Sequence, residues 1–202
     1  MCLAMYLFTD NNIKETQYNI NNPSMFIESI NSSHNEYENI LKWLDNKNKI
    51  YYLGSSEGCG CGWKNTYLYT NSYNDEIKYY SEMIGIKKAN ILEINYENIC
   101  YELIENNIKY LESEIPEIIN SRKKNLKNQI ENHKDSIKKL KEYKNDRKNL
   151  HYFLKSMNFK GSFIILCWEG DQGKEINETI ELNIETIKNI DYEFKEMVKY
   201  IL

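Results

Sequence analysis

The chain has 202 residues and a formal net charge of −4, with 41% hydrophobic and 28% charged residues. This length suffices for one well-buried domain, or for a core domain with an appendage. The 17 tyrosines and only two prolines argue against an intrinsically disordered chain. No stretch approaches the ~18 apolar residues of a membrane span, and no basic residue precedes Lys14, so the start does not resemble a signal peptide. We therefore expect a soluble, cytoplasmic protein without a membrane partner.

The first third of the chain predicts two buried strands separated by a loop and a helix. The short apolar run CLAMYLF (2–8) is typical of a buried strand. Residues 10–33 are rich in Asn and Ser and predict mostly loop, and 35–45 predicts a helix with one apolar side. IYYL (50–53) predicts the second strand.

The middle of the chain is helical in pattern. A helix is expected over 76–85, ending at Gly85, and ANILEI (89–94) fits either a strand or the entry to a helix. Residues 96–157 contain no Gly and repeat apolar residues at helical spacing, with a change of phase near Asn120 and Ser121. These features predict a coiled-coil-like helical hairpin with its corner at that pair.

Pro116 is expected to kink the first arm of this hairpin or to move its turn a few residues earlier. Beyond the hairpin, the continuous apolar run of 162–168 predicts a central strand, and 176–182 alternates as a fourth strand. The tail fits an edge strand better than a helix. The predicted fold class is α+β, with a small mixed or antiparallel sheet and packed helices. Its core domain comprises 1–95 and 158–202, with 96–157 as the inserted hairpin.

Charge is unevenly distributed along the chain. Residues 121–160 hold 13 Lys or Arg and four Asp or Glu, a net of +9, whereas 91–119 carry a net of −6. A basic helix can bind nucleic-acid phosphates. An acidic arm folded back on a basic arm explains the same charges as intramolecular pairing, and we favour that explanation. A projecting hairpin also offers a surface for a protein partner.

The stretch GSSEGCGCGWK (54–64) holds two of the five cysteines. Its glycine spacing fits neither a Walker A loop nor a dinucleotide-binding fingerprint. In extended backbone, Cys59 and Cys61 point to the same side, about 6.5–7 Å apart at Cα. Two such thiolates can share a metal ion, and zinc is the expected metal. Cys2, Cys100 and Cys167 are the candidates for further ligands, of which we favour Cys167. The alternative is that both cysteines only pack as small apolar side chains.

Two other groups merit a hypothesis. Removal of the initiator Met would expose Cys2 as an N-terminal thiol and amine, the pair that N-terminal nucleophile hydrolases use. No histidine or other base is spaced to complete such a site, so the sequence argues weakly against an enzyme. Glu169 and Asp171 follow the third strand and could bind a metal or another ligand or act as acid and base, but we favour a solvated turn.

Three stretches together, MCLAMYLFTD, IYYLGSSEGCGCGW and FIILCWEGDQ, resemble a family of small uncharacterised bacterial proteins. That family shares an N-terminal Met-Cys strand, a Gly-Cys-Gly-Cys-Gly-aromatic motif and a Cys-Trp-acidic-Gly-Asp motif. The resemblance covers the core, with 96–157 as the variable part, and implies no activity, substrate or cofactor. It implies that the two cysteine motifs belong to one pattern.

We therefore expect a thiol-lined site formed by 54–63 and 167–171 that binds a metal or a small ligand. Its predicted ligand-binding residues are Gly58, Cys59, Gly60, Cys61, Trp63, Trp168, Glu169 and Asp171. The first alternative is an interaction protein, such as an inhibitor of a host or phage nucleoprotein, that docks through the hairpin. The second is a thiol-dependent hydrolase that uses Cys2.

Overall fold

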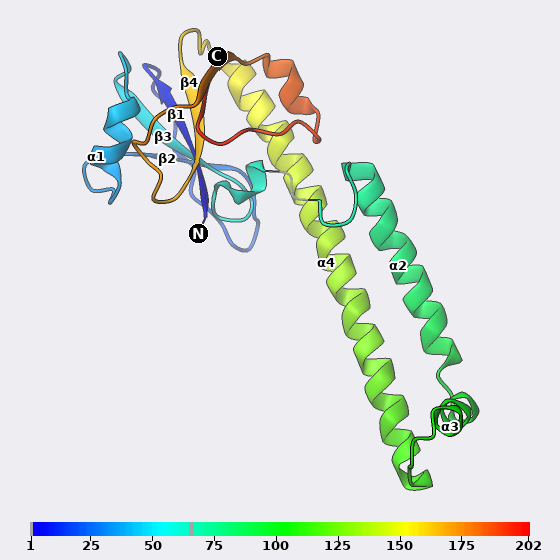
Figure 1. Cartoon of the computed structure of the whole chain (residues 1–202). Coiled ribbons are helices and arrows are strands. Elements are labelled where there is room, and N and C mark those ends of the chain that lie inside the picture. The colour runs from blue at the N-terminus through cyan, green and yellow to red at the C-terminus, as the bar shows by residue number, and fades with distance from the viewer. Residues whose placement is uncertain (1, 65–66) are drawn as a thin grey trace. The chain divides into compact units, whose positions relative to one another are not determined.

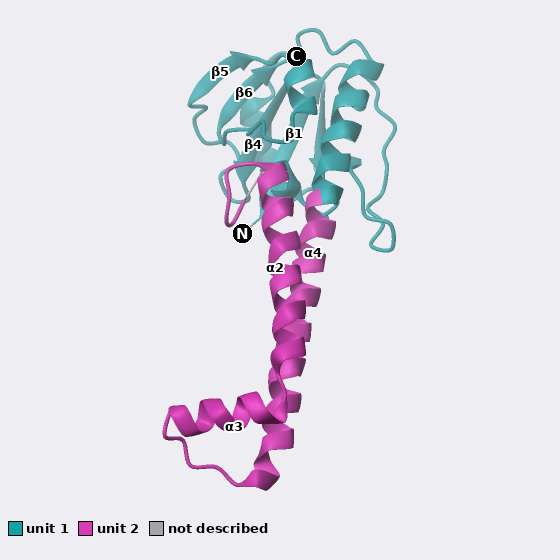
Figure 2. Ribbon diagram, turned by 90° about the vertical axis from the view of Figure 1, so that its right-hand side faces the viewer, with its two compact units in different colours: residues 1–66, 141–202 teal, residues 67–140 magenta. Residues whose placement is uncertain are grey.

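The computed structural model describes residues 2–64 and 67–202. The chain divides into two compact units: 1–66 together with 141–202, and 67–140 (Figure 2). The fold is of the predicted α+β class. The second unit begins about thirty residues before the expected start of the insertion at 96, and it ends before 157.

The first unit contains a mixed sheet whose described strands follow the order β2-β3-β1-β4-β6-β5. All neighbours are antiparallel except β5 and β6, which are parallel. The strands are β1 (Leu3–Thr9), β2 (Phe26–Ser29), β3 (Lys49–Gly54), β4 (Phe163–Trp168), β5 (Glu178–Glu181) and β6 (Val198–Ile201).

The two central strands, β1 and β4, are buried on both faces of the sheet. All seven residues of β1 are buried, which explains why its sequence is apolar without alternation. Leu3, Met5 and Leu7 pack on one face, while Ala4 and Tyr6 pack on the other. Because Leu3 pairs with Trp168, the start of β1 lies beside the end of β4. The two cysteine-containing ends of the core strands are therefore neighbours.

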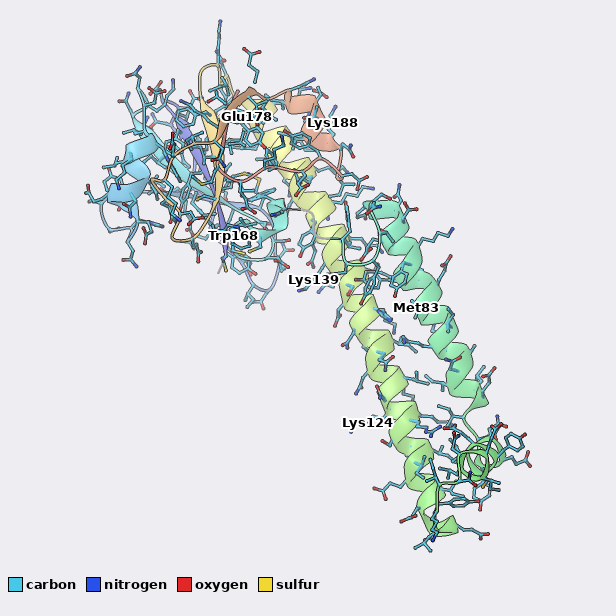
Figure 3. All side chains as sticks on the ribbon, viewed as in Figure 1. Met83, Lys124, Lys139, Trp168, Glu178 and Lys188 are labelled. Atoms are coloured by element: carbon cyan, nitrogen blue, oxygen red, sulfur yellow. The ribbon has the colours of Figure 1, made fainter. Side chains whose placement is uncertain are left out.

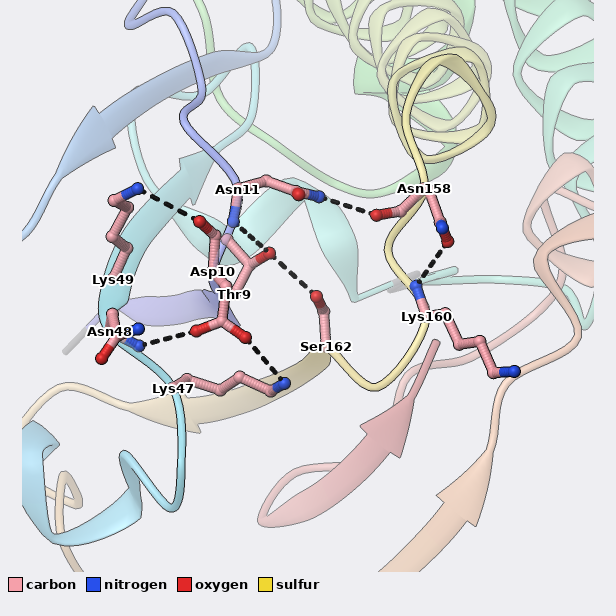
Figure 4. Close-up of polar contacts among 9 residues, drawn as sticks. All are labelled: Thr9, Asp10, Asn11, Lys47, Asn48, Lys49, Asn158, Lys160 and Ser162. Carbon is pink, nitrogen blue, oxygen red and sulfur yellow. Dashed lines mark hydrogen bonds and ion pairs between the residues drawn. The ribbon is translucent and has the colours of Figure 1, made fainter.

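Helices cover both faces of this sheet. The Leu3 face packs against the C-terminal part of α4 (Ile115–Ser156) through Leu150 and Leu154. The Tyr6 face packs against α1 (Tyr37–Ile40) and the 3₁₀ turn that follows it. Figure 1 shows α1 and the end of α4 on opposite sides of the sheet. At the far end of β1, Asp10 accepts hydrogen bonds from Lys47 and the backbone of Asn48, at 3.1 Å each (Figure 4).

Three sequence predictions for this unit hold only in part. The segment 10–33 is mostly loop, as predicted, but it contains the edge strand β2. The helix expected over 35–45 is only Tyr37–Ile40 with a 3₁₀ turn at Leu41–Trp43. The tail forms a strand, as predicted, but β6 is interior because the short, polar β5 pairs along its outer side and takes the edge.

The second unit is built from α2 (Tyr73–Glu93), α3 (Tyr96–Glu105) and residues 115–140 of α4 (Ile115–Ser156). The paired helices are α2 and α4, since Lys87 Nζ donates to Gln129 Oε1 at 2.6 Å. The expectation that α2 ends at Gly85 is wrong, because Gly85 lies inside the helix. The segment 89–94 is mostly the last turn of the same helix.

The predicted corner at Asn120 and Ser121 is also wrong, because both residues lie inside α4. The turn lies earlier, between α3 and the 3₁₀ turn Glu112–Glu114. Pro116 is the second residue of α4, where no intrahelical hydrogen bond is expected of its nitrogen. Pro116 therefore starts the helix and kinks no arm, and the turn lies earlier, as the second expectation for this residue stated.

Candidate metal centre

The loop between β3 and Trp63 is tightly organised by its own backbone. Ser55 N donates to Cys59 O at 2.8 Å, and the Ser55 hydroxyl donates to the same oxygen at 2.7 Å. Gly62 N in turn donates to Ser55 Oγ at 3.2 Å. Gly58 has a φ of +77°, a conformation that side chains rarely adopt. Ser55 and Gly58 thus fold the loop so that both of its cysteines face one place.

Gly60 lets this loop approach β1 closely. A Cβ atom built on Gly60 would lie 2.5 Å from Leu3 O and 2.8 Å from Leu3 C. No side chain fits at that separation, so glycine is required by the close approach of two backbones. The glycine brings the cysteines on either side of it next to the first residues of β1.

Three cysteines meet at this point. The sulfur atoms of Cys2, Cys59 and Cys61 all lie within 4.8 Å of one another, and each residue is half-buried. Leu3 N donates to Cys61 Sγ and Cys61 N donates to Cys59 Sγ, at 3.3 Å each. Within residues 2–64 and 67–202, this is the one group of His, Cys, Asp or Glu side chains arranged to hold a metal ion.

The local conformation of the two loop cysteines differs from the extended segment that the alternating sequence predicts. Cys59 is extended, with φ −148° and ψ −175°, but Cys61 lies in a 3₁₀ turn, Gly60–Trp63. The thiols come together because the turn folds the Cys61 amide back onto the Cys59 sulfur. The alternation of Gly and Cys therefore predicted correctly that Cys59 and Cys61 lie together, although the extended backbone on which that prediction rested is not observed.

The environment of the cluster disfavours a bare thiolate. Burial raises the pKa of the Cys59 thiol to about 12, and the side chain of Cys61 adds to this effect through a hydrogen bond and its charge. The backbone N–H of Cys61 acts in the opposite direction. Neighbouring thiolates repel one another, which adds to the cost of ionising Cys59. A bound cation reverses the effect, since a coordinating thiol is deprotonated outright.

Cys167 does not join the cluster, contrary to the sequence prediction. It pairs with Ala4 in the sheet, is 0% exposed, and packs with Ala4 and Tyr6 on one face. Cys61 packs against the opposite face, beside Leu3. The pairing register of β4 therefore turns the Cys167 thiol away, and Cys2 takes the third position.

The two predicted tryptophans have different surroundings. Trp63 is 0% exposed, and its indole N–H donates to Leu53 O at 2.7 Å, so it anchors the end of the loop. Trp168 lies at the end of the sheet where β1 begins (Figure 3), and its indole N–H donates to Glu196 Oε2 at 2.7 Å. Lys64 pairs with the same carboxylate at 2.5 Å. Nothing in the sequence indicated that Lys64 and Glu196 would lie beside Trp168.

The turn after β4 meets the start of β1, because Glu169 N donates to Cys2 O at 2.8 Å. The two cysteine motifs are thus adjacent at Glu169, although Cys167 faces away. Asp171 is separate: its carboxylate forms an ion pair with Lys174, which fits the expected solvated turn. No hydrogen bond joins the Cys2 thiol to a histidine in the described part of the chain, and the hydrolase remains a prediction.

Acidic and basic side chains of the helical arm form ion pairs with one another, and one of these pairs joins α3 to α4. Arg122 contacts Glu102 through two hydrogen bonds, at 2.6 and 2.9 Å, both within the second unit. Apolar side chains in the same unit remain exposed, including Tyr101 at 70% and Ile104 at 65%. Neither observation identifies a partner, so protein and nucleic-acid binding by this arm stay predictions.

No protein-family model, curated protein or solved structure matches this chain. The fold and the site define an α+β protein with a three-cysteine cluster at the end of its sheet. Among the helices described, none combines the length and apolar character needed to cross a bilayer.

Proposed function

We propose that this protein binds a thiophilic metal ion, with zinc as the first choice, through Cys2, Cys59 and Cys61. The observation that carries the proposal is the mutual approach of the three sulfur atoms to within 4.8 Å. Thiolates are the preferred protein ligands of zinc, and three of them from two separate segments provide most of a tetrahedral site.

The geometry supports coordination with little rearrangement. Zinc–sulfur bonds of ~2.3 Å in a tetrahedral site place sulfur atoms ~3.8 Å apart. The sulfurs must therefore approach by no more than ~1 Å, which side-chain rotation can supply. The two amide donors to Cys59 and Cys61 lie where they stabilise negative charge on the sulfurs.

Three protein ligands leave the fourth coordination position of zinc for water or a small exogenous ligand. Such an open position is typical of catalytic zinc sites, whereas structural sites use four protein ligands. The alternative ion is copper(I), which also prefers soft thiolate ligands. The small ligand expected from the sequence fits this function as the occupant of the open position.

The test is metal analysis of natively purified protein, followed by zinc titration in competition with a chromophoric chelator. We expect one zinc per chain and a loss of affinity of more than ~100-fold in each of Cys2→Ser, Cys59→Ser and Cys61→Ser. Cys100→Ser is the matched control, because Cys100 is half-buried in the other unit. If the protein binds no thiophilic metal, or if the control loses as much affinity, the proposal is wrong.

A further inference from the structure

A second site lies on the face of the sheet that packs against α1. A cavity of about 450 Å³ opens there, lined by Tyr6 and Tyr52 from the sheet, by residues of the 33–36 segment, and by the turn after β4. This volume lies within the ~300–1,000 Å³ range of small-molecule sites. All of its lining residues belong to the first unit.

The cavity carries uncompensated negative charge. Its lining contains the carboxylates of Glu28, Glu36 and Glu169 and the imidazole of His34, but no Lys or Arg. The Glu36 carboxylate accepts a hydrogen bond from the Asn39 amide at 2.9 Å. The carboxylates of Glu28 and Glu169 form no hydrogen bond or ion pair with any residue that the structure describes. A cationic ligand would supply the missing charge.

The walls of the cavity are aromatic, and their hydroxyl groups are incompletely used. Tyr6 is 2% exposed, and its hydroxyl accepts from Gln172 Nε2 at 3.1 Å. Within the described residues, the proton and the second lone pair of the Tyr6 hydroxyl have no partner. The Tyr52 hydroxyl has none in the same part of the chain, and the two rings lie edge to face at 5.9 Å. A buried side chain with spare hydrogen-bonding capacity therefore faces this cavity.

The carboxylates of the cavity are not gathered around one point, as the ligands of a metal ion would be. Their oxygens and the His34 nitrogens do not form a group of three donors within 4.8 Å; in the described chain that arrangement is found at the cysteine cluster. Charges that are spread around a cavity suit a longer cation, and aromatic faces attract ammonium groups and cover the methylenes between them.

We propose that this cavity binds a small aliphatic amine that carries at least two ammonium groups. Glu28, Glu36 and Glu169 receive the ammonium groups, and Tyr6 and Tyr52 pack along the chain that joins them. The site is distinct from the metal centre, because none of the three cysteines lines the cavity.

The test is calorimetric titration of the full chain at low salt with spermidine, with hexane-1,6-diol and succinate as the neutral and anionic probes. We expect saturable binding of spermidine alone, weakened about tenfold in each of Glu28→Gln and Glu169→Gln and weakened further by added salt. Glu38→Gln is the matched control, since it makes the same charge change on an exposed residue of α1 outside the cavity.

The proposal is overturned if spermidine fails to bind at about 10 mM, if hexane-1,6-diol binds equally well, or if Glu38→Gln weakens binding as much as Glu169→Gln. The last result would show attraction to the acidic surface in general. Cys61→Ser separates this site from the metal centre: the variant should lose zinc and keep spermidine affinity. Loss of spermidine affinity in a folded Cys61→Ser protein counts against an independent site.

Discussion

The carboxylate of Asp146 accepts the backbone N–H of Ser56 at 2.8 Å, although 90 residues separate the two in the sequence. Both residues are buried. One residue further along the same helix, Arg147 donates to Trp63 O at 2.6 Å. Helix α4 therefore holds both ends of the loop that carries Cys59 and Cys61, and it positions the candidate metal centre.

We expect Asp146→Ala to lower the free energy of unfolding by about 1–3 kcal/mol, because the buried Ser56 N–H loses its acceptor. Asp146→Asn keeps a carbonyl oxygen in the same place and should cost less than about 1 kcal/mol at neutral pH. Equilibrium unfolding in urea measures both values. Equal losses in the two variants would show that this hydrogen bond does not stabilise the loop.

The same carboxylate predicts a dependence of stability on pH. Burial raises the pKa of Asp146 above its ordinary value, while hydrogen bonds from Ser56 act in the opposite direction. Between the unfolded pKa and the raised folded pKa, the folded state binds more protons than the unfolded state. Stability contributed by this group is therefore full below the unfolded pKa, and it is lost as pH rises through the folded pKa.

Asp146→Asn removes this titration. Unfolding measured in steps from about pH 4 upward should show the wild-type chain losing stability relative to the variant as pH rises. The difference should level off once Asp146 is fully ionised in the folded state. A difference that is constant across this range, or that changes in the opposite direction, contradicts the assignment of a raised pKa to Asp146.

The sequence predicts the central strands well and the helical arm poorly, for physical reasons. Strands β1 and β4 are apolar on both faces because both faces are buried, and such continuous apolar runs can be recognised from the sequence alone. The edge strand β2 has two exposed residues among its four, so nothing in its composition distinguishes it from a loop. The ends of α2 were misplaced because Gly85 costs an exposed helix only about 1 kcal/mol.

The candidate site shows the same limit. Proximity in sequence was enough to pair Cys59 with Cys61. Which cysteine is the third ligand depends on the register of β4, because a shift of one residue moves each side chain to the other face of the sheet. The sequence alone does not give this register. That register turns Cys167 into the core and leaves Cys2 at the cluster. Arg147 occupies a position of the apolar helical repeat that runs from Leu126 to Leu154, and a charged residue at such a position is the sequence signal of a buried polar contact. Asp146 has no such signal.

Gly60→Ala should destabilise the first unit by about 1–3 kcal/mol, because its Cβ would overlap the backbone of Leu3. The loop must move away from β1, so zinc affinity should fall in the same variant. Gly85→Ala is the matched control: nothing lies within 4 Å of its Cβ position, and it should stabilise α2 by about 0.5–1 kcal/mol. Urea unfolding and the chelator competition measure the two effects. A neutral Gly60→Ala would mean that the close approach is not required.

Zinc binding should also be visible as stability, because an ion that binds the folded state stabilises it by mass action. Free zinc at about 100 times its dissociation constant is expected to add about 2.7 kcal/mol to the free energy of unfolding. Cys61→Ser should abolish this increment.

Cys167→Ala should lower stability in the absence of metal, since it truncates a fully buried side chain, and should keep the increment. Thermal and urea unfolding with and without zinc, after treatment with a chelator, compare the three proteins. An increment that survives in Cys61→Ser but disappears in Cys167→Ala would place the metal on the opposite face of the sheet.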